Sequence, residues 1–385
     1  MLQAIKQIIL FIRVEASGGV LLFGAAILAL IACNSSFAPV YEAIVSSSLR
    51  SYVNDYGMAL FFLLVGLEIK REVLEGELSS RETALLPTLC AVGGMVVPAL
   101  IYFVCVRTEP GALRGWAIPT ATDIAFSLGV LSLFGTSLPL GLKVFLTALA
   151  IIDDLLAILV IAIFYTEGLV APYLFVSGIL LSVLLLLNRG RVKRILPYLI
   201  VGSALAYTIH HGGIHATIAG VLTALAVPLD NTTPEIDSPL EILEHTLHPW
   251  IAYLVLPLFG FLNAGVALDG FSFATLLEPI TLGSFTGLFI GKLTGVFLIG
   301  VLAVKSGIAQ LPEGVSWRQF FGLSILTGIG FTMSLFIGGL AFSDIERLEM
   351  AKTGVLLGSL ASMVVGGLVL VVTRDTSRTT QVKRG

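Results

Sequence analysis

Residues 148–164 read ALAIIDDLLAILVIAIF, a run in which two adjacent aspartates, Asp153 and Asp154, stand among wholly apolar neighbours. The rest of the chain has the same character, with 56% hydrophobic and 12% charged residues, against about 25% charged residues in an ordinary soluble protein. This composition excludes a water-soluble globule and indicates a membrane protein. The net charge of −3 gives no basic surface for nucleic acid. The three cysteines show no spacing typical of a disulfide framework or a zinc site.

A membrane-spanning helix needs about 20 apolar residues. Division of the chain at its charged and Pro/Gly-rich breaks gives twelve candidates, so we expect an all-α polytopic protein with one transmembrane domain over residues 1–385. The candidate spans are residues 16–33, 54–75, 83–106, 112–134, 142–165, 172–188, 194–208, 213–227, 244–266, 281–304, 318–341 and 348–372. The seventh and eighth are short, so one or both could be half-buried instead of fully spanning.

The distribution of Lys and Arg sets the expected orientation. With the N-terminus in the cytoplasm, 16 of the 22 Lys and Arg residues fall on the cytoplasmic side, 5 on the outer side, and Lys292 within a span. Cytoplasmic loops carry the excess of positive residues, so both termini are expected in the cytoplasm, including a tail at 374–385. One alternative is a lipoprotein cleavage site at residues 30–33, LIAC, but the preceding apolar run is longer than an ordinary signal-peptide core.

Four ionisable residues lie near the middle of the fourth, fifth and tenth spans: Asp123, Asp153, Asp154 and Lys292. Each charge at the bilayer centre costs about 2.5–3.5 kcal/mol, or roughly 10–14 kcal/mol for four, as much as the whole stability of a typical domain. A structural salt bridge explains one aspartate with Lys292 but leaves two carboxylates over. Such residues therefore indicate an ion or proton pathway. Successive helical residues differ by about 100°, so Asp153 and Asp154 are expected to serve different partners.

Two spans contain sequences that should interrupt their helices, residues 117–123 (AIPTATD) and 327–334 (TGIGFTMS). The residues expected to cause or relieve the interruptions are Pro119, Thr120, Gly328 and Gly330. These spans are the middle members of two triplets, at about 83–165 and 281–372, as in transporters built from inverted-topology repeats that cross at mid-membrane. The alternative is two ordinary kinked helices. An interrupted helix exposes an N-terminal end with a partial positive charge and a C-terminal end with a partial negative charge. Asp123 and Lys292 carry charges of the signs that would offset these ends.

Several motifs, read together, are more specific than any one of these features. They are Thr122-Asp123, Ile151-Ile152-Asp153-Asp154, residues 213–217 (GIHAT), residues 244–250 (EHTLHPW), Gly291-Lys292 and residues 328–334 (GIGFTMS). In this order along the chain they resemble the NhaA family of bacterial sodium/proton antiporters, over about residues 10–372. The resemblance implies a multi-pass protein of the bacterial inner membrane that exchanges cytoplasmic Na⁺ or Li⁺ for external protons. It implies no enzyme activity and no cofactor besides the transported ions.

The resemblance also implies roles for individual residues. Asp154 resembles the principal cation ligand of the family. Asp153 resembles the neighbouring residue that pairs with Lys292 in one protonation state. Asp123 and Thr122 resemble residues at the crossing of the two interrupted helices. Na⁺ is thus expected at Asp154 and Asp153. The residues matching a cluster linked to pH activation are Glu68, Arg71, Glu72, Glu244, His245 and His248, with His215 as a further pH-response position.

Some of these implications have alternatives. A lone histidine such as His215 could equally be a hydrogen-bonded packing residue. His245 and His248 lack the HExxH pattern of a zinc site. The loop at 34–53 is shorter than the family's β-hairpin, which joins two protomers, so a homodimer is left open.

The expected mechanism follows from the chemistry of a buried carboxylate. Burial favours the protonated form and a nearby cation favours the ionised form, so the group can hold a proton or Na⁺ but not both. A site that opens to each side only when loaded then moves the two ions in opposite directions. Several titratable groups permit more than one proton per cation, hence electrogenic exchange. An intramembrane aspartyl protease would need a GxGD sequence, which is absent, and a channel would need no buried Lys–Asp pair.

Overall fold

The computed structural model describes residues 2–134, 137–166, 168–229, 238–268 and 272–373; the predicted tail at 374–385 lies outside these residues. The described part of the chain consists of helices and connecting loops and contains no strand, as the composition predicts. The first half contains α1 Leu2–Cys33, α2 Ala38–Val45, α3 Ser48–Tyr52, η1 Val53–Gly57, α4 Met58–Leu74, α5 Arg81–Val106, η2 Ala112–Thr120, α6 Ile124–Ser132, α7 Leu140–Phe164 and α8 Ala171–Arg189. The second half contains α9 Ile195–His211, α10 Ala216–Ala226, α11 Pro239–Trp250, η4 Ile251–Val255, α12 Leu256–Asn263, α13 Phe273–Leu276, α14 Pro279–Thr286, η5 Gly287–Gly291, α15 Lys292–Lys305, α16 Trp317–Leu326, α17 Phe331–Ala341 and α18 Ile345–Thr373.

Every one of the twelve predicted spans contains helix. Among the described residues, seven helical spans are long and apolar enough to cross a membrane, or eight if α1 and α2, which meet at a bend of 118°, count as one. The other predicted spans contain helices that are shorter, such as α10, or broken, such as η2 with α6. Several apolar spans therefore cross the membrane, and the number twelve stays a prediction.

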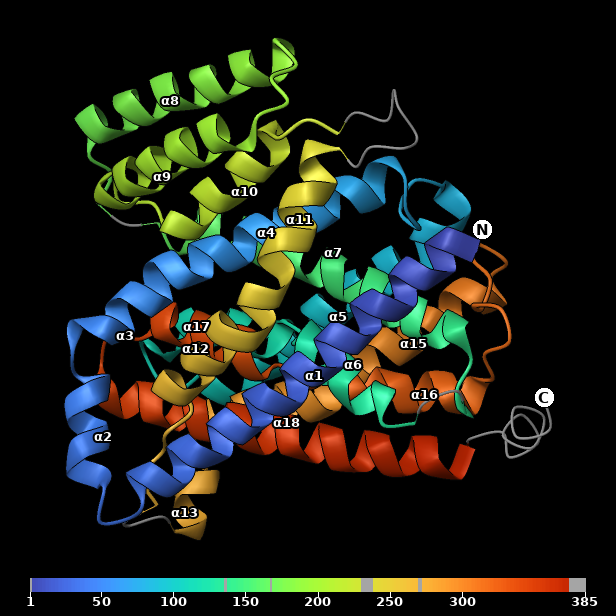
Figure 1. Ribbon diagram of the computed structural model, residues 1–385. Helices are drawn as coiled ribbons and strands as arrows, with labels where there is room; N and C mark the ends of the chain where they lie inside the picture. Colours follow the sequence, from blue (N-terminus) through green and yellow to red (C-terminus); the bar gives the residue numbers. More distant parts are fainter. Residues whose placement is uncertain (1, 135–136, 167, 230–237, 269–271, 374–385) are drawn as a thin grey trace.

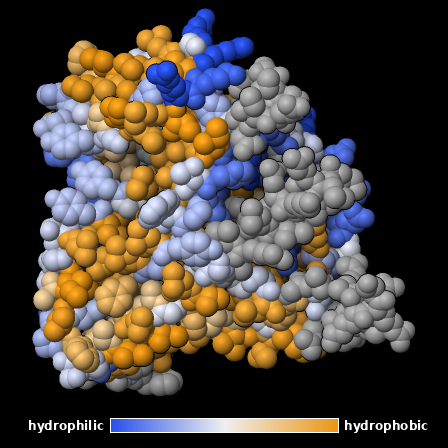
Figure 2. Space-filling model, in the orientation of Figure 1, coloured by the Kyte–Doolittle hydropathy of each residue, from blue (hydrophilic) through white to orange (hydrophobic). Residues whose placement is uncertain are grey.

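The surface is that of a membrane protein. Large apolar side chains on the outer faces of the long helices are exposed, among them Leu28 on α1, Phe175 on α8 and Leu368 on α18. Figure 2 shows apolar side chains spread over broad areas of the face that these helices form. Exposed apolar areas of this extent mark contact with lipid or with another protein.

The helices enclose two hydrophobic cores. The larger is built mainly by residues of α1, the helices from α4 to α7, α12 and the helices from α14 to α18. The smaller is built by residues of α4 and the helices from α8 to α11, with Tyr198 fully buried within it. Figure 1 shows α8, α9 and α10 gathered at one side of the molecule. It also shows that α1 begins and α18 ends at the same end of the bundle.

Two of the predicted spans are each interrupted by non-helical residues deep within the larger core. The 3₁₀ helix η2 ends at Thr120 and α6 starts at Ile124, while α16 ends at Leu326 and α17 starts at Phe331. Non-helical residues lie between them at 121–123 and 327–330. These breaks fall within the two sequences expected to interrupt their helices.

Candidate functional site

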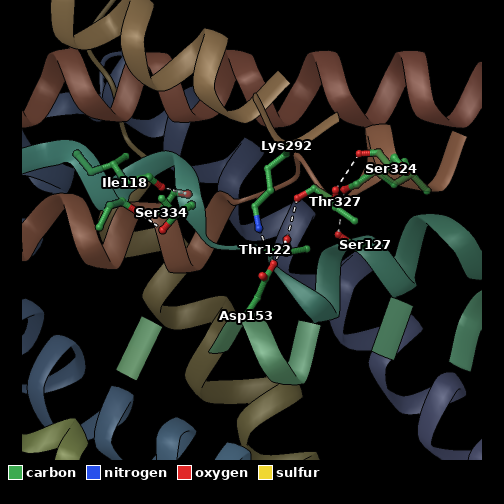
Figure 3. Close-up of polar contacts among 11 residues, drawn as sticks. Ile118, Thr122, Ser127, Asp153, Lys292, Ser324, Thr327 and Ser334 are labelled. Atoms are coloured by element: carbon green, nitrogen blue, oxygen red, sulfur yellow. Dashed lines mark hydrogen bonds and ion pairs between the residues drawn. The ribbon is translucent and has the colours of Figure 1, made fainter. Parts of the chain in front are cut away.

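A buried ion pair joins α7 to α15. Lys292 Nζ donates to Asp153 Oδ2 over 2.5 Å, and the two side chains are 0% and 1% exposed. Thr122 Oγ1 lies 2.7 Å from the same carboxylate oxygen. Figure 3 shows the lysine reaching toward Thr122 and Asp153 from the opposite side to α7. A lysine at the centre of a bundle requires such a partner, because an unpaired buried charge costs several kcal/mol.

A close helix contact brings Lys292 to this position. Glycines recur every four residues along α14, η5 and α15, and that face lies directly against α5. A Cβ added at Gly291 would lie 2.7 Å from Pro98 Cα, and one at Gly295 would lie 2.2 Å from the carbonyl oxygen of Gly93. The π-helical turn η5 ends immediately before Lys292. Such turns insert an extra residue into a helix and frequently occur at functional sites.

Asp154 is 2% exposed and follows Asp153 on the same helix. Its Oδ1 is buried without a hydrogen-bond partner among the described residues, and the same holds for Oδ1 of Asp153. Because buried polar atoms are normally hydrogen-bonded, two such carboxylate oxygens on adjacent residues point to a ligand. Carboxylate oxygens suit a small hard cation. The arrangement can therefore hold either a proton or a cation.

Asp123 accepts hydrogen bonds from the N-terminal turns of two helices. As the N-cap of α6, its Oδ1 accepts from Phe126 N at 2.9 Å. Its Oδ2 accepts from Thr332 N at 3.0 Å and from Thr332 Oγ1 at 2.5 Å, in the first turn of α17. Its backbone N donates to Ile329 O at 2.7 Å, joining the two non-helical segments directly. One carboxylate thus meets the partial positive charge of two helix ends.

Two serines connect the interrupted segments reciprocally. Ser334 on α17 donates to the carbonyl oxygen of Ile118 in η2 at 2.6 Å, and Ser127 on α6 donates to Leu326 O at the end of α16 at 3.4 Å. Each serine therefore bonds to a carbonyl near the end of the other segment's first helix (Figure 3). The predicted repeats at 83–165 and 281–372 would place the segments in this relation, and they stay a prediction.

Thr122 has two acceptors for one proton. Its Oγ1 lies 2.7 Å from Asp153 Oδ2 and 2.8 Å from the carbonyl oxygen of Thr327, just after α16. A hydroxyl group donates only one hydrogen bond. When Asp153 is protonated it can donate to Thr122, which then donates to Thr327. The hydroxyl therefore connects the protonation of Asp153 to the break in the other segment.

The predicted acidic and basic cluster forms in part between α4 and α11. Arg71 Nη1 donates to Glu244 Oε1 at 2.5 Å, and its Nη2 lies 3.2 Å from Glu72 Oε1. Glu68, one turn earlier on α4, is buried at 4% exposure, and Glu244 is buried at 2%. The structure therefore brings Arg71, Glu72 and Glu244 into contact.

The three predicted pH-response histidines lie in different surroundings. On α11, His245 is exposed whereas His248, one turn later, is buried. His215 is the N-cap of α10, where its Nδ1 accepts from Thr217 N at 3.5 Å and lies 3.1 Å from Thr217 Oγ1. Its Nε2 lies 3.6 Å from Asp55 Oδ1. His215 thus has a structural task whether or not it also responds to pH.

Sequence reasoning did not single out four hydroxyl residues of this site. They are Ser127, Thr327, Thr332 and Ser334. All four lie within or next to the two predicted interruptions. Hydroxyl groups at positions where helices break could have identified them, since freed backbone groups need such partners.

Three comparisons with known proteins bear on this site. The chain matches the family described as Na⁺/H⁺ antiporter 1 over residues 10–370. It is 50% identical to the Na(+)/H(+) antiporter NhaA of Rhodospirillum rubrum, with 96% of this chain and 98% of that protein covered. It is 51% identical to the Na(+)/H(+) antiporter NhaA of Mesorhizobium japonicum, with 94% of each covered. The sodium proton antiporter MjNhaP1 of Methanocaldococcus jannaschii has a similar fold, with a TM-score of 0.54, 15% identity and 96% of both chains covered.

Proposed function

The chain belongs to the Na⁺/H⁺ antiporter 1 family, and from this we propose that it exchanges Na⁺ or Li⁺ for protons across a bacterial inner membrane as a secondary active transporter. The observation that carries the proposal is the buried Asp153–Lys292 pair beside Asp154, whose Oδ1 has no hydrogen-bond partner within the described part of the chain. The Asp153–Lys292 pair is neutral overall when both groups are charged, whereas an ionised Asp154 carries a negative charge that this pair does not offset. We assign cation binding to Asp154, assisted by Asp153.

The charges of the site explain why the two ions compete. Ionised Asp153 is offset by Lys292, which leaves one negative charge on ionised Asp154. Either one proton or one Na⁺ neutralises this charge. A site that holds neither ion carries an uncompensated charge in a low-dielectric interior. Binding of one ion therefore displaces the other, which is the basis of exchange.

The Asp153–Lys292 pair can contribute a second proton. If a bound cation draws Asp153 toward itself, Lys292 loses its counter-charge and favours its neutral form by releasing a proton. Two protons then leave for each cation that binds, and each cycle moves one net charge. This supports electrogenic exchange driven by the membrane potential.

The broken helices suit alternating access. Asp123 and Thr122 hold the crossing through side-chain bonds, and a few such bonds can rearrange while the helices stay intact. The site lies where the two segments meet, so a small movement of one against the other can change the side to which Asp154 opens. Transport follows if the movement occurs only when the site holds a proton or a cation.

The cluster of Arg71, Glu72 and Glu244 supports regulation by pH. It joins α4 to α11, and its charged groups are separate from the Asp153–Lys292 pair. A change in ionisation there would alter how the two helices are held together. Because Lys and Arg are concentrated in loops on one side, we place this cluster and both termini at the cytoplasmic face.

Inside-out vesicles with an imposed pH gradient test the proposal. Addition of NaCl should dissipate the gradient with the wild type, and Asp154→Asn should abolish the response. The matched control is Asp344→Asn, at a carboxylate that is 57% exposed, which should respond like the wild type. No response of the wild type, or a full response of Asp154→Asn, would overturn the assignment.

The same vesicles separate electrogenic exchange from two other cases. With valinomycin and K⁺ to set the membrane potential, the rate of Na⁺-driven proton movement should change with the imposed potential. A rate independent of potential would indicate electroneutral exchange. Na⁺ movement without any proton movement would indicate a channel.

A further inference from the structure

The short helix α2 is fixed across one end of the bundle. The chain turns through 118° between α1 and α2, and Figure 1 shows α2 running across the end of the bundle at which α18 begins. At the turn, Asn34 Nδ2 donates to Val266 O at 2.8 Å and its Oδ1 accepts from Leu268 N at 2.6 Å. Within α2, the hydroxyl of Tyr41 donates to Phe261 O at 2.8 Å. These bonds to α12 and to the segment after it hold α2 in this orientation.

The helix has three distinct sides. Phe37, Val40 and Ile44 are 67%, 59% and 36% exposed, and at about 100° per residue they fall within an arc of roughly 60°. Tyr41 is buried at 6% exposure and faces the protein. Glu42 is exposed and lies almost opposite the apolar side, at roughly 160° from Ile44. One side therefore packs on the protein, one is apolar and exposed, and one is polar.

We propose that α2 lies in the interfacial layer of the membrane, with Phe37, Val40 and Ile44 inserted into lipid and Glu42 directed to water. A helix in the membrane plane with apolar and polar sides is the form that interfacial helices take. The apolar side also continues the exposed apolar surface of α1, where Leu28 and Ile31 are 60% and 59% exposed shortly before the turn. Lipid that covers α1 thus extends to α2.

A second copy of the chain is the other occupant that an apolar side could have. The three side chains expose roughly 300 Å², whereas a stable dimer buries about 800 Å² per partner. Inclusion of Leu49 and Tyr52 of α3, at 43% and 61% exposure, does not close this difference. The area and the continuity with α1 favour lipid. This inference concerns the loop at 34–53 alone and does not depend on the ion that is transported.

Spin labels on opposite sides of α2 test the proposal in proteoliposomes of the full chain. Single cysteines replace Val40 and Glu42, about 160° apart around the helix, in a background whose three native cysteines are serine, and Leu28→Cys marks the lipid-facing surface of α1. The accessibility of each label to oxygen and to the aqueous reagent Ni-EDDA is measured by power saturation. The label at 40 should resemble the label at 28, with high oxygen and low Ni-EDDA accessibility. The label at 42 should show several-fold higher Ni-EDDA accessibility.

Two results would overturn the proposal. Equal accessibility of the labels at 40 and 42 to Ni-EDDA would place α2 in water. Shielding of the label at 40 from both reagents, with spin–spin broadening between molecules, would show a second copy on this side. Phe37→Cys and Ser46→Cys, about 180° apart, report on the same two sides if either first variant fails to fold.

Discussion

Removal of the lysine of the buried pair should destabilise the protein strongly. Lys292→Met leaves the Asp153 carboxylate without its cation at a site where both side chains are at most 1% exposed. Removal of one partner of a buried pair costs about 3–5 kcal/mol. Thr122 can still donate to the carboxylate, so we expect the lower end, about 3 kcal/mol. The free energy of unfolding in mixed micelles, from titration with a denaturing detergent, measures this loss.

The double variant Lys292→Met/Asp153→Asn separates the pair from the rest of the site. With both charges gone, no carboxylate is left uncompensated, and the loss should fall to about 1 kcal/mol. The matched control is Lys352→Met. Lys352 is also buried, but its partner Glu349, 2.7 Å away, is 38% exposed, so water can replace the lysine and the loss should stay below about 1 kcal/mol. Equal losses for the two lysine variants, or no recovery in the double variant, would refute the reasoning.

Three further substitutions test other parts of the account. Ser334→Ala removes the side-chain donor to Ile118 O and should lower the free energy of unfolding by about 1–2 kcal/mol in the same titration. Gly330→Ala should abolish Na⁺-driven proton movement in the vesicle assay. The added Cβ would lie 2.2 Å from Ser334 Oγ and 3.0 Å from the backbone carbonyl oxygen of Ala121, so the crossing of the two interrupted segments would have to shift. Arg71→Gln breaks the ion pair with Glu244 and should change the pH profile of exchange but not its maximal rate, as a pH series of that assay would show.

The sequence predicts most of the helical architecture because spans are encoded by composition. The run at 142–165 corresponds to α7, Leu140–Phe164, and the run at 348–372 to α18, Ile345–Thr373. The breaks at 121–123 and 327–330 were also predictable, since proline and glycine weaken helices wherever they occur. These are local properties of the chain.

Contacts between distant residues were harder to predict. The family resemblance implied the partner of Asp153, but helix periodicity shows only that Asp153 and Asp154 differ in direction. The π-helical turn before Lys292 and the two acceptors of Thr122 depend on how helices pack. Lys352 falls within the predicted span at 348–372, and it is only 5% exposed on α18. Sequence position alone does not reveal such burial.

Competition between Na⁺ and protons at Asp154 is the central claim, and proton release on Na⁺ binding tests it directly. Purified protein is titrated with NaCl by calorimetry in buffers of different ionisation enthalpy, which gives the number of protons released per cation. We predict release of at least one proton with the wild type and no Na⁺ binding with Asp154→Asn. Binding of Na⁺ without proton release, or unchanged release in Asp154→Asn, would contradict the account.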